Sequence, residues 1–511
     1  MICGTAQGRG GDMAKISSTS VAIDRLARSS ITAFFVYCAG IGLTYCSQLI
    51  IARVVGIDTY GMYAYVFAWM TVLTYCSTLG FDVALLRFVP TYEAQRAWPL
   101  LQGVIQYAQR RVAFIGLAVI GVGSCVILPW ASTPELRNTF LVGFMVVPVL
   151  ALVRLRCSVL RAFGGVVSAL APDRAVRDGM LIALVSVAAL VLGWRVDAPA
   201  VMLATLVSSA VALACTSVVM RRRRPAGLGA VMPTYDPPTW RRTAIPLVVL
   251  GATESLMNRT GVMLLGSIAD TKSAGIYSLA FNIALVVTLP RIAVNTLFAP
   301  EISGLHARKE TAMMQLLITK ASSWTLGAGL CMAVGLFLLA TPLLGWFGTG
   351  YEAGVPALRI LLVSQVIAAG AGSQLYVMTM TGHEQSAAVL LTCSAIVNAI
   401  ASIFLISWFG FTGAAISTGT VLIIWNAAMG LFLWQKLNLF PGVLAIFRFS
   451  DRSTQRGAVG GVPHVPNLPV WISRWSKAER DSRARGAGRG TASTAKRRSR
   501  WLTSIIRGDI S

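Results

Sequence analysis

The sequence predicts an all-α integral membrane protein, with about twelve transmembrane helices in two six-helix lobes. Of its 511 residues, 55% are hydrophobic and only 13% are charged, whereas a soluble protein carries roughly 25% charged residues. Apolar runs of about 20 residues recur along most of the chain, and each is long enough to cross a ~30 Å hydrocarbon core. A phrase near the start also recurs at the beginning of the second half, which favours two related halves.

The apolar runs predict twelve membrane spans. They cover residues 29–51, 61–85, 112–131, 139–160, 179–195, 199–220, 244–268, 275–299, 321–346, 357–380, 386–408 and 412–434. Lysine and arginine are concentrated in alternate connections, such as 161–178 with Arg174 and Arg177, while the intervening turns are short and carry few basic residues. By the positive-inside rule, we expect both termini in the cytoplasm, which for a bacterial protein means a multi-pass protein of the inner membrane.

The proline-rich connection 221–243 separates six spans from six. It predicts a cytoplasmic N-terminal segment 1–28, a first lobe 29–220, an inter-lobe loop 221–243, a second lobe 244–437 and a basic tail 438–511. The tail is rich in Gly, Ser and Arg, so we expect it to be disordered. Gly61-Met-Tyr63 and Gly275-Ile-Tyr277 both follow a polar turn at the start of a span. This match favours an internal duplication, because transporter folds are commonly built from repeats.

Several functional classes are disfavoured. The formal charge of +24 would suit nucleic-acid binding, but the basic residues follow the membrane topology, so no nucleic-acid partner is expected. The chain has no nucleotide-binding G-x-x-x-x-G-K-[ST] loop. Its nine cysteines and three histidines lack the spacing of metal ligands. We therefore expect no metal, no cofactor and no catalytic residue, and the short outer loops also disfavour a membrane polymerase.

Candidate binding residues are the charges inside predicted spans. Glu254, Asn258 and Arg259 interrupt the span 244–268, and Arg291 follows Pro290 past the middle of the next span. A charge at that depth costs roughly 2.5–3.5 kcal/mol, so it normally faces a cavity or a partner. We expect Arg259, held by Glu254, to line a cavity and attract a phosphate, because the guanidinium group binds oxyanions bidentately. The alternative is an ion pair that only joins two helices.

Two further residues are candidates near the cytoplasmic ends of their spans. Arg154 is either a positive-inside anchor or part of the inner rim of the cavity. Asp82, five residues before Arg87, and Glu254 are the two candidate carboxylates for coupling transport to an ion gradient.

Short motifs across the chain resemble one family. In the first half they are LIIARVVG at 49–56, YGMY at 60–63 and LLRF at 85–88. In the second half they are MLLG at 263–266, AGIY at 274–277, LFAPEIS at 297–303, ALRIL at 357–361 and GFTGAAI at 410–416. In order and spacing, over residues 29–437, these motifs resemble the polysaccharide transporter family, the O-antigen and exopolysaccharide flippases. That family belongs to the multidrug/oligosaccharidyl-lipid/polysaccharide exporter superfamily.

The resemblance implies two six-helix lobes around a cavity, and transport of an undecaprenyl-pyrophosphate-linked oligosaccharide to the outer leaflet for surface polysaccharide such as lipopolysaccharide. It implies a cavity lined with basic residues, a role that Arg259 and Arg291 fit, and no catalytic motif. Expected partners are the lipid-linked substrate, membrane lipids and the polymerase and glycosyltransferases of the same pathway. The basic tail departs from the usual family pattern.

Two other transport functions compete with the flippase. A drug/ion antiporter of the same fold would need acidic cavity residues for cationic substrates, but the candidate arginines outnumber the carboxylates. A flippase for peptidoglycan precursors would generally carry two extra helices, which the sequence does not show.

Overall fold

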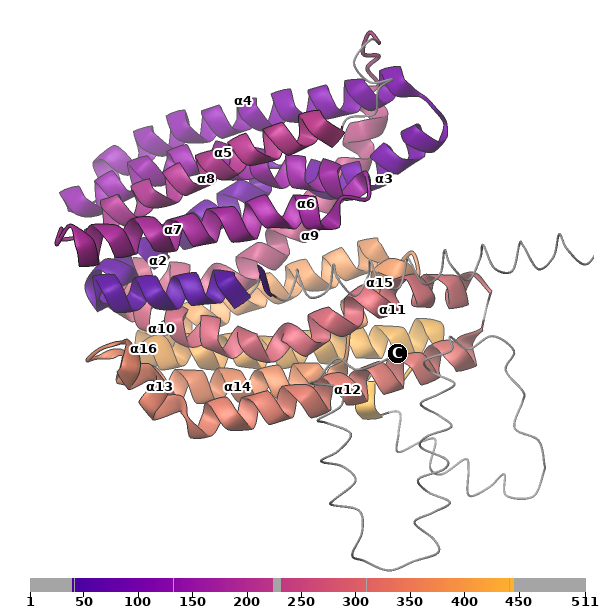
Figure 1. The fold of residues 1–511 in the computed structure, drawn as a ribbon. Helices are drawn as coiled ribbons and strands as arrows, with labels where there is room; N and C mark the ends of the chain where they lie inside the picture. The colour runs from indigo at the N-terminus through magenta and orange to yellow at the C-terminus, as the bar shows by residue number, and fades with distance from the viewer. Residues whose placement is uncertain are drawn as a thin grey trace, which may run out of the picture. The chain divides into compact units, whose positions relative to one another are not determined.

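The computed structural model describes residues 39–40, 42–131, 133–223, 231–308, 310–440 and 442–444, and every regular element in these ranges is a helix (Figure 1). Eight of the helices are long and apolar enough to cross a membrane by length and composition. The predicted fold class, an all-α membrane protein, is therefore confirmed. The predicted N-terminal segment 1–28 and residues 445–511 of the predicted tail lie outside the described residues.

The first half of the chain begins with the helix Gly42–Val55. It continues with α2 (Ile57–Ser77), α3 (Phe81–Ala94), α4 (Trp98–Trp130), α5 (Pro134–Ala162), α6 (Val166–Leu170), the π-helix η1 (Ala171–Val176), α7 (Arg177–Ser186), the π-helix η2 (Val187–Val191) and α8 (Ala198–Arg223). The predicted span 61–85 is divided between α2 and α3. The predicted span 112–131 is the second part of the much longer α4.

The second half begins with α9 (Pro237–Leu264), the π-helix η4 (Leu265–Ala269), α10 (Thr271–Leu285), the 3-10 turn η5 (Val286–Thr288) and α11 (Leu289–Ala307). It continues with α12 (Thr311–Leu338), α13 (Ala340–Phe347), the 3-10 turn η6 (Tyr351–Gly354), α14 (Val355–Ala371), α15 (Gln374–Met380), α16 (Glu384–Leu437) and the 3-10 turn η7 (Gly442–Leu444). Helix α9 starts inside the predicted loop 221–243, because the Asp236 carboxylate accepts a hydrogen bond from the Thr239 N–H (3.5 Å) at its first turn and prolines favour the first helical positions.

Two sequence features mark breaks that the structure contains. Helix α16 bends at Gly410, which has φ 56° and ψ −134°, and this divides it where the predicted spans 386–408 and 412–434 meet. Pro290 is the second residue after the 3-10 turn Val286–Thr288. A proline has no N–H to donate to the preceding helical turn, so a break at this point is expected.

The hydrophobic core is continuous at one end of the helices and divided at the other. A first cluster contains residues of both halves, including Tyr63 of α2 and Tyr277 of α10. A second cluster contains only residues of α3, α4, α5, α8 and the start of α9, with Ala169 between α5 and α7. A third contains residues of α11, α12, α15 and α16, together with Leu439. The halves are therefore packed together near α2 and α10 and have separate cores at the far ends of their helices.

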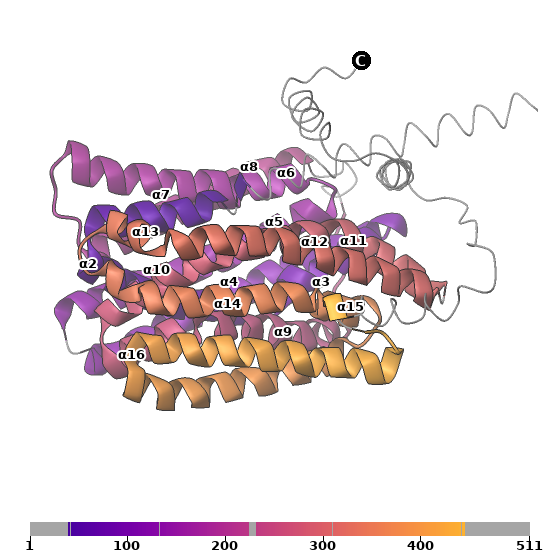
Figure 2. The same cartoon turned by 90° about the horizontal axis from the view of Figure 1, so that it is seen from below.

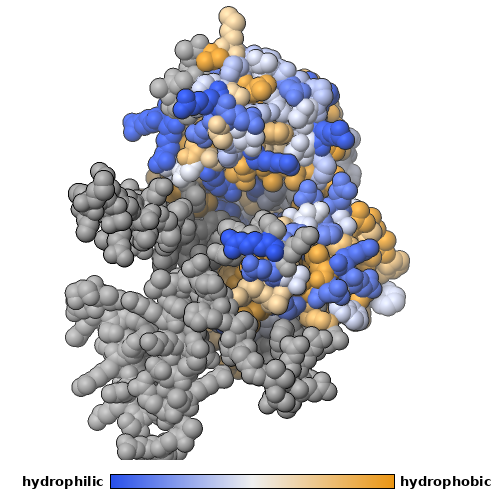
Figure 3. Space-filling view, turned by 90° about the vertical axis from the view of Figure 1, so that its right-hand side faces the viewer, coloured by the Kyte–Doolittle hydropathy of each residue, from blue (hydrophilic) through white to orange (hydrophobic). Residues whose placement is uncertain are grey.

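The end with separate cores carries α3, α11 and α15. Figure 3 views the molecule from this side and shows hydrophilic patches beside hydrophobic ones on it. The predicted cytoplasmic ends of the spans lie at this end of the molecule. In the predicted orientation, this end therefore faces the cytoplasm.

A basic cavity between the two halves

A cavity of about 440 Å³ lies between the two halves, and we call it the central cavity. Residues of α2, α5, η1, α9, α10, α11, α14, α15 and α16 line it. The charged residues among its described lining are Arg154, Arg174, Glu254, Arg259 and Arg291. Four arginines thus face a single carboxylate, which makes the cavity strongly basic.

The structure brings five of the six candidate site residues together. Arg154 of α5, Glu254, Asn258 and Arg259 of α9, and Arg291 of α11 all line the central cavity. Glu254 and Asn258 are solvent-exposed although they lie far along α9 from its ends. Their exposure is to the cavity, and this is how α9 keeps polar side chains inside a span.

The structure does not contain the expected ion pair between Glu254 and Arg259. Arg291 of α11 lines the same cavity and is the charged residue that interacts electrostatically with Glu254. Five residues along a helix correspond to about 140° of rotation, so Glu254 and Arg259 point in different directions. The Asn258 amide instead donates a hydrogen bond back to the Glu254 carbonyl oxygen (3.0 Å).

Arg259 is a cation without an acidic partner. It forms no ion pair with any residue that the structure describes, and its strongest electrostatic neighbours are the hydroxyl groups of Tyr45, Tyr60 and Tyr75. Among the described residues, no carboxylate forms an ion pair with the Arg259 guanidinium group. It can therefore bind an oxyanion without first breaking an ion pair.

Arg154 lies on the ring of Tyr75, with its guanidinium carbon 4.0 Å from the ring centroid. The face of an aromatic ring attracts a cation. This contact therefore holds the Arg154 guanidinium group at the cavity wall and away from a lipid headgroup. Arg154 was expected to be either a positive-inside anchor or part of the inner rim of the cavity. Its position in the cavity lining agrees with the second interpretation.

Asp82 does not belong to the described lining of the central cavity. It lies half-buried in the first turn of α3, where it accepts a hydrogen bond from the Thr78 hydroxyl (3.2 Å). It contributes to the electrostatic surroundings of Arg154.

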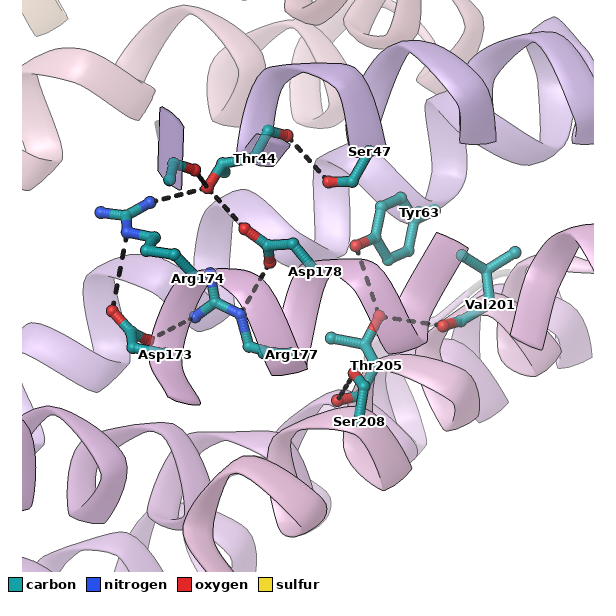
Figure 4. A network of polar contacts seen from close by, with 11 residues as sticks. Thr44, Ser47, Tyr63, Asp173, Arg174, Arg177, Asp178, Val201, Thr205 and Ser208 are labelled. Atoms are coloured by element: carbon teal, nitrogen blue, oxygen red, sulfur yellow. Dashed lines mark hydrogen bonds and ion pairs between the residues drawn. The ribbon is translucent and has the colours of Figure 1, made fainter. Parts of the chain in front are cut away.

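A second cavity of about 270 Å³ adjoins the first, and Tyr45, Arg174 and Arg259 line both. Its other charged residues are Arg177 and Asp178. Figure 4 shows how these side chains are connected. Arg177 joins two carboxylates, with its Nη1 3.1 Å from Asp173 Oδ1 and its Nε 2.9 Å from Asp178 Oδ1.

The same network reaches the helix Gly42–Val55. The Thr44 hydroxyl donates to Asp178, and it accepts a hydrogen bond from Arg174 Nη1 (2.9 Å). Arg174 also pairs with Asp173, Nε to Oδ2, at 3.6 Å. Both carboxylates are therefore held by arginines of the same helical segment, while Arg174 also faces the central cavity.

Arg174 and Arg177 correct the sequence analysis, which placed them in the connection 161–178. They lie in the π-helical segment Ala171–Val176 and at the start of α7, where their side chains face the second cavity. A π-helical turn redirects side chains and is frequent at functional sites. The spacing of the charges was the available signal. Asp173 and Arg177, and likewise Arg174 and Asp178, are opposite charges four residues apart, which is typical of a helix.

The comparisons with known proteins agree with this architecture. A family model described as "Polysaccharide biosynthesis protein" matches residues 26–303, more than half of the chain. No curated protein matches the sequence.

Solved structures are similar over most of the chain. An inward-facing multidrug resistance MATE family transporter of the MOP superfamily aligns with TM-score 0.63 and 13% identity, covering 84% of this chain and 96% of the other. A point mutant of the Vibrio cholerae MATE transporter VcmN aligns with TM-score 0.60 and 16% identity, covering 81% and 98%. A MOP superfamily transporter from Pyrococcus furiosus, described as having a binding pocket of reverse polarity, aligns with TM-score 0.60 and 12% identity, covering 80% and 95%. At these identities the likeness shows the fold alone, which this chain shares with these three proteins.

Proposed function

Because the chain belongs to the polysaccharide biosynthesis protein family, we propose that it is a flippase for an undecaprenyl-pyrophosphate-linked oligosaccharide in the bacterial inner membrane. The observation that carries this proposal is the charge of the central cavity, where four arginines face one carboxylate. A diphosphate headgroup carries the complementary charge, and arginine binds phosphate oxygens bidentately. The substrate class itself comes from the family resemblance.

The proposed transport cycle is alternating access. The divided core at one end and the continuous core at the other support an inward-opening state, with both termini in the cytoplasm. The headgroup enters from the cytoplasmic side, pairs with Arg259 and Arg174, and keeps its lipid tail in the bilayer. Separation of α2 from α10 and approach of the two inner cores then exposes it on the other side.

Of the two carboxylates considered for ion coupling, we favour Glu254. It lines the cavity opposite Arg291, so its protonation state would change with the binding of an anion beside it. Asp82 lies outside the described lining of the cavity. The pathway's polymerase and glycosyltransferases are the proposed partners, and no nucleic acid is involved.

A drug/ion antiporter is the competing function, since the structural neighbours include multidrug transporters. Such a protein would bind cations, and the described lining of the central cavity offers them only Glu254, which already faces Arg291. The cavity charge therefore favours the anionic substrate.

Complementation of a deletion strain tests the proposal. Arg259→Ala and Arg291→Ala should each reduce export of the surface polysaccharide while the protein reaches the membrane at the wild-type level. Arg110→Ala is the matched control, because Arg110 is exposed on α4 and lies outside the described lining of both cavities. Wild-type export by both cavity variants contradicts the assignment. A deletion strain with normal export but increased sensitivity to cationic drugs identifies the antiporter instead.

A further inference from the structure

The central cavity has two chemically different walls. Its charged residues come from α5, η1, α9 and α11, whereas none of the described lining residues between 365 and 426 carries a charge. That second wall contains four buried amide side chains, which we call the amide wall: Gln365, Gln374, Asn398 and Asn426, exposed by 7%, 4%, 1% and 6%. They come from α14, α15 and the two limbs of α16, and Figure 2 shows these helices side by side.

The amide wall retains hydrogen-bonding capacity toward the cavity. Gln374 donates from Nε2 to the Ala371 carbonyl oxygen (3.2 Å), but its buried Oε1 has no hydrogen-bond partner among the described residues. On α9, the buried Ser255 hydroxyl of the same cavity also lacks a hydrogen-bond partner among the described residues. Buried polar atoms are almost always satisfied by protein or by water. These two atoms are therefore open to hydrogen bonds from a ligand that displaces water from the cavity.

Other members of the wall are held rigidly by their neighbours. Asn398 accepts a hydrogen bond from the Ser417 hydroxyl (3.1 Å) at Oδ1, and Asn426 donates one amide proton to the Leu422 carbonyl oxygen (2.7 Å). Each amide oxygen has two lone pairs and each amide nitrogen two protons, so these bonds leave further donors and acceptors. The wall is thus preorganised for a ligand with hydroxyl groups.

Aromatic rings complete the wall. Trp425 and Tyr376 both line the cavity, and the Trp425 indole N–H is directed to the Met429 sulfur (3.1 Å), which fixes the orientation of the ring. A fixed ring with an apolar face beside amide groups suits a sugar ring, which has an apolar face and a rim of hydroxyls that both donate and accept. A cationic drug would need a carboxylate, and this wall has none in its described lining.

We infer that the amide wall is a subsite for neutral sugar residues, separate from the arginines that hold the diphosphate. This inference rests on the proposed function and deepens it, because it assigns the two ends of one substrate to two walls. Gln374, Asn426 and Trp425 then determine which headgroups are transported, and Arg259 determines that a lipid diphosphate is bound at all.

The test measures the affinity of the full chain in lipid nanodiscs for three probes. They are undecaprenyl diphosphate, the same lipid carrying a neutral trisaccharide, and the same lipid carrying a trisaccharide that contains a uronic acid. The lipid with the neutral trisaccharide should bind about 10-fold more tightly than the bare lipid. Its gain in affinity should be at least as large as the gain from the acidic trisaccharide. Gln374→Ala and Asn426→Ala should each remove roughly 3- to 10-fold of that gain, with binding of the bare lipid unchanged.

Further variants separate stacking from folding. Trp425→Phe should keep most of the sugar-dependent gain and Trp425→Ala should lose it, because only the first retains a ring face. Asn138→Ala, an amide exposed on α5 outside the described lining of the cavity, should behave as the wild type. The inference is wrong if Gln374→Ala and Asn426→Ala keep the full gain, or if they weaken binding of the bare lipid as much as that of the glycosylated one.

A different variant tests the proposed function itself. Arg259→Gln should weaken the binding of all three lipid probes equally. If the wild type binds no lipid diphosphate, the proposed function is contradicted, and the same trisaccharide on an uncharged lipid then decides the subsite. Binding that depends on Gln374 and Asn426 supports the amide wall, and binding that does not, or no binding, overturns it.

Discussion

Gly275 packs directly against Gly61, so that a methyl group on Gly275 would lie 2.6 Å from the Gly61 Cα atom. These glycines occupy the same place in the two repeated phrases, Gly-x-Tyr, of the sequence. Their lack of side chains lets α2 and α10 approach closely, as small residues do at helix interfaces in membranes. The repeated motif therefore forms the contact between the two halves, at the end where the core is continuous.

Replacing Gly61 by alanine should weaken this contact. The new methyl group would overlap the backbone oxygen of Thr271, which cannot move as a flexible side chain does. We expect a loss of about 1–3 kcal/mol in the free energy of unfolding, measured by denaturant titration in detergent. Gly335→Ala on α12 is the control, because a methyl group there meets nothing within 4 Å. Equal stability of the two variants would contradict the close contact.

The pairing of Glu254 with Arg291 predicts which substitutions are coupled. In a double-mutant cycle with Glu254→Gln and Arg291→Gln, the two changes should be non-additive by about 0.5–3 kcal/mol in unfolding free energy. The cycle with Glu254→Gln and Arg259→Gln should be close to additive, since the structure directs these side chains apart. The reverse pattern would restore the tether within α9 that the sequence alone suggested.

Asp178→Asn should destabilise the first half of the chain. Asp178 is only 3% exposed and pairs with Arg177, so its neutralisation leaves a buried guanidinium with a single carboxylate, Asp173. Breaking a buried pair in this way costs about 3–5 kcal/mol, and thermal unfolding of the purified protein measures it. Asp197→Asn, on an exposed carboxylate before α8, should change stability by less than about 0.5 kcal/mol. A similar small effect at Asp178 would show that the network is not structural.

Gly410→Ala tests the bend of α16. At φ 56° and ψ −134° a side chain is strained, and no neighbour lies within 4 Å of the position, so the effect should come from the backbone alone. We expect a loss of about 1–3 kcal/mol in unfolding free energy. Gly327→Ala on α12, also in open space but in a regular helix, should be neutral or stabilising by up to about 1 kcal/mol. Equal effects at both positions would mean that the bend tolerates a side chain.

Much of the candidate site was predictable because a charge in an apolar run is visible locally. Glu254, Asn258, Arg259 and Arg291 stood out for this reason, and all line one cavity. Arg174 and Arg177 were assigned to a cytoplasmic connection and not to the site, because arginines just before a span are expected as topological anchors. The amide wall was not predicted, since single Asn and Gln residues in apolar helices have no local signature of a shared wall.

The sequence by itself determined the class of fold and the breaks at Pro290 and Gly410, because hydropathy and backbone chemistry act within a few turns of one helix. Only the tertiary structure decided which charges face each other. Glu254 interacts electrostatically with Arg291, and Gly61 contacts Gly275, because helices far apart in the chain pack together. Such pairings depend on the rotation and depth of each helix, which are set by contacts with its neighbours.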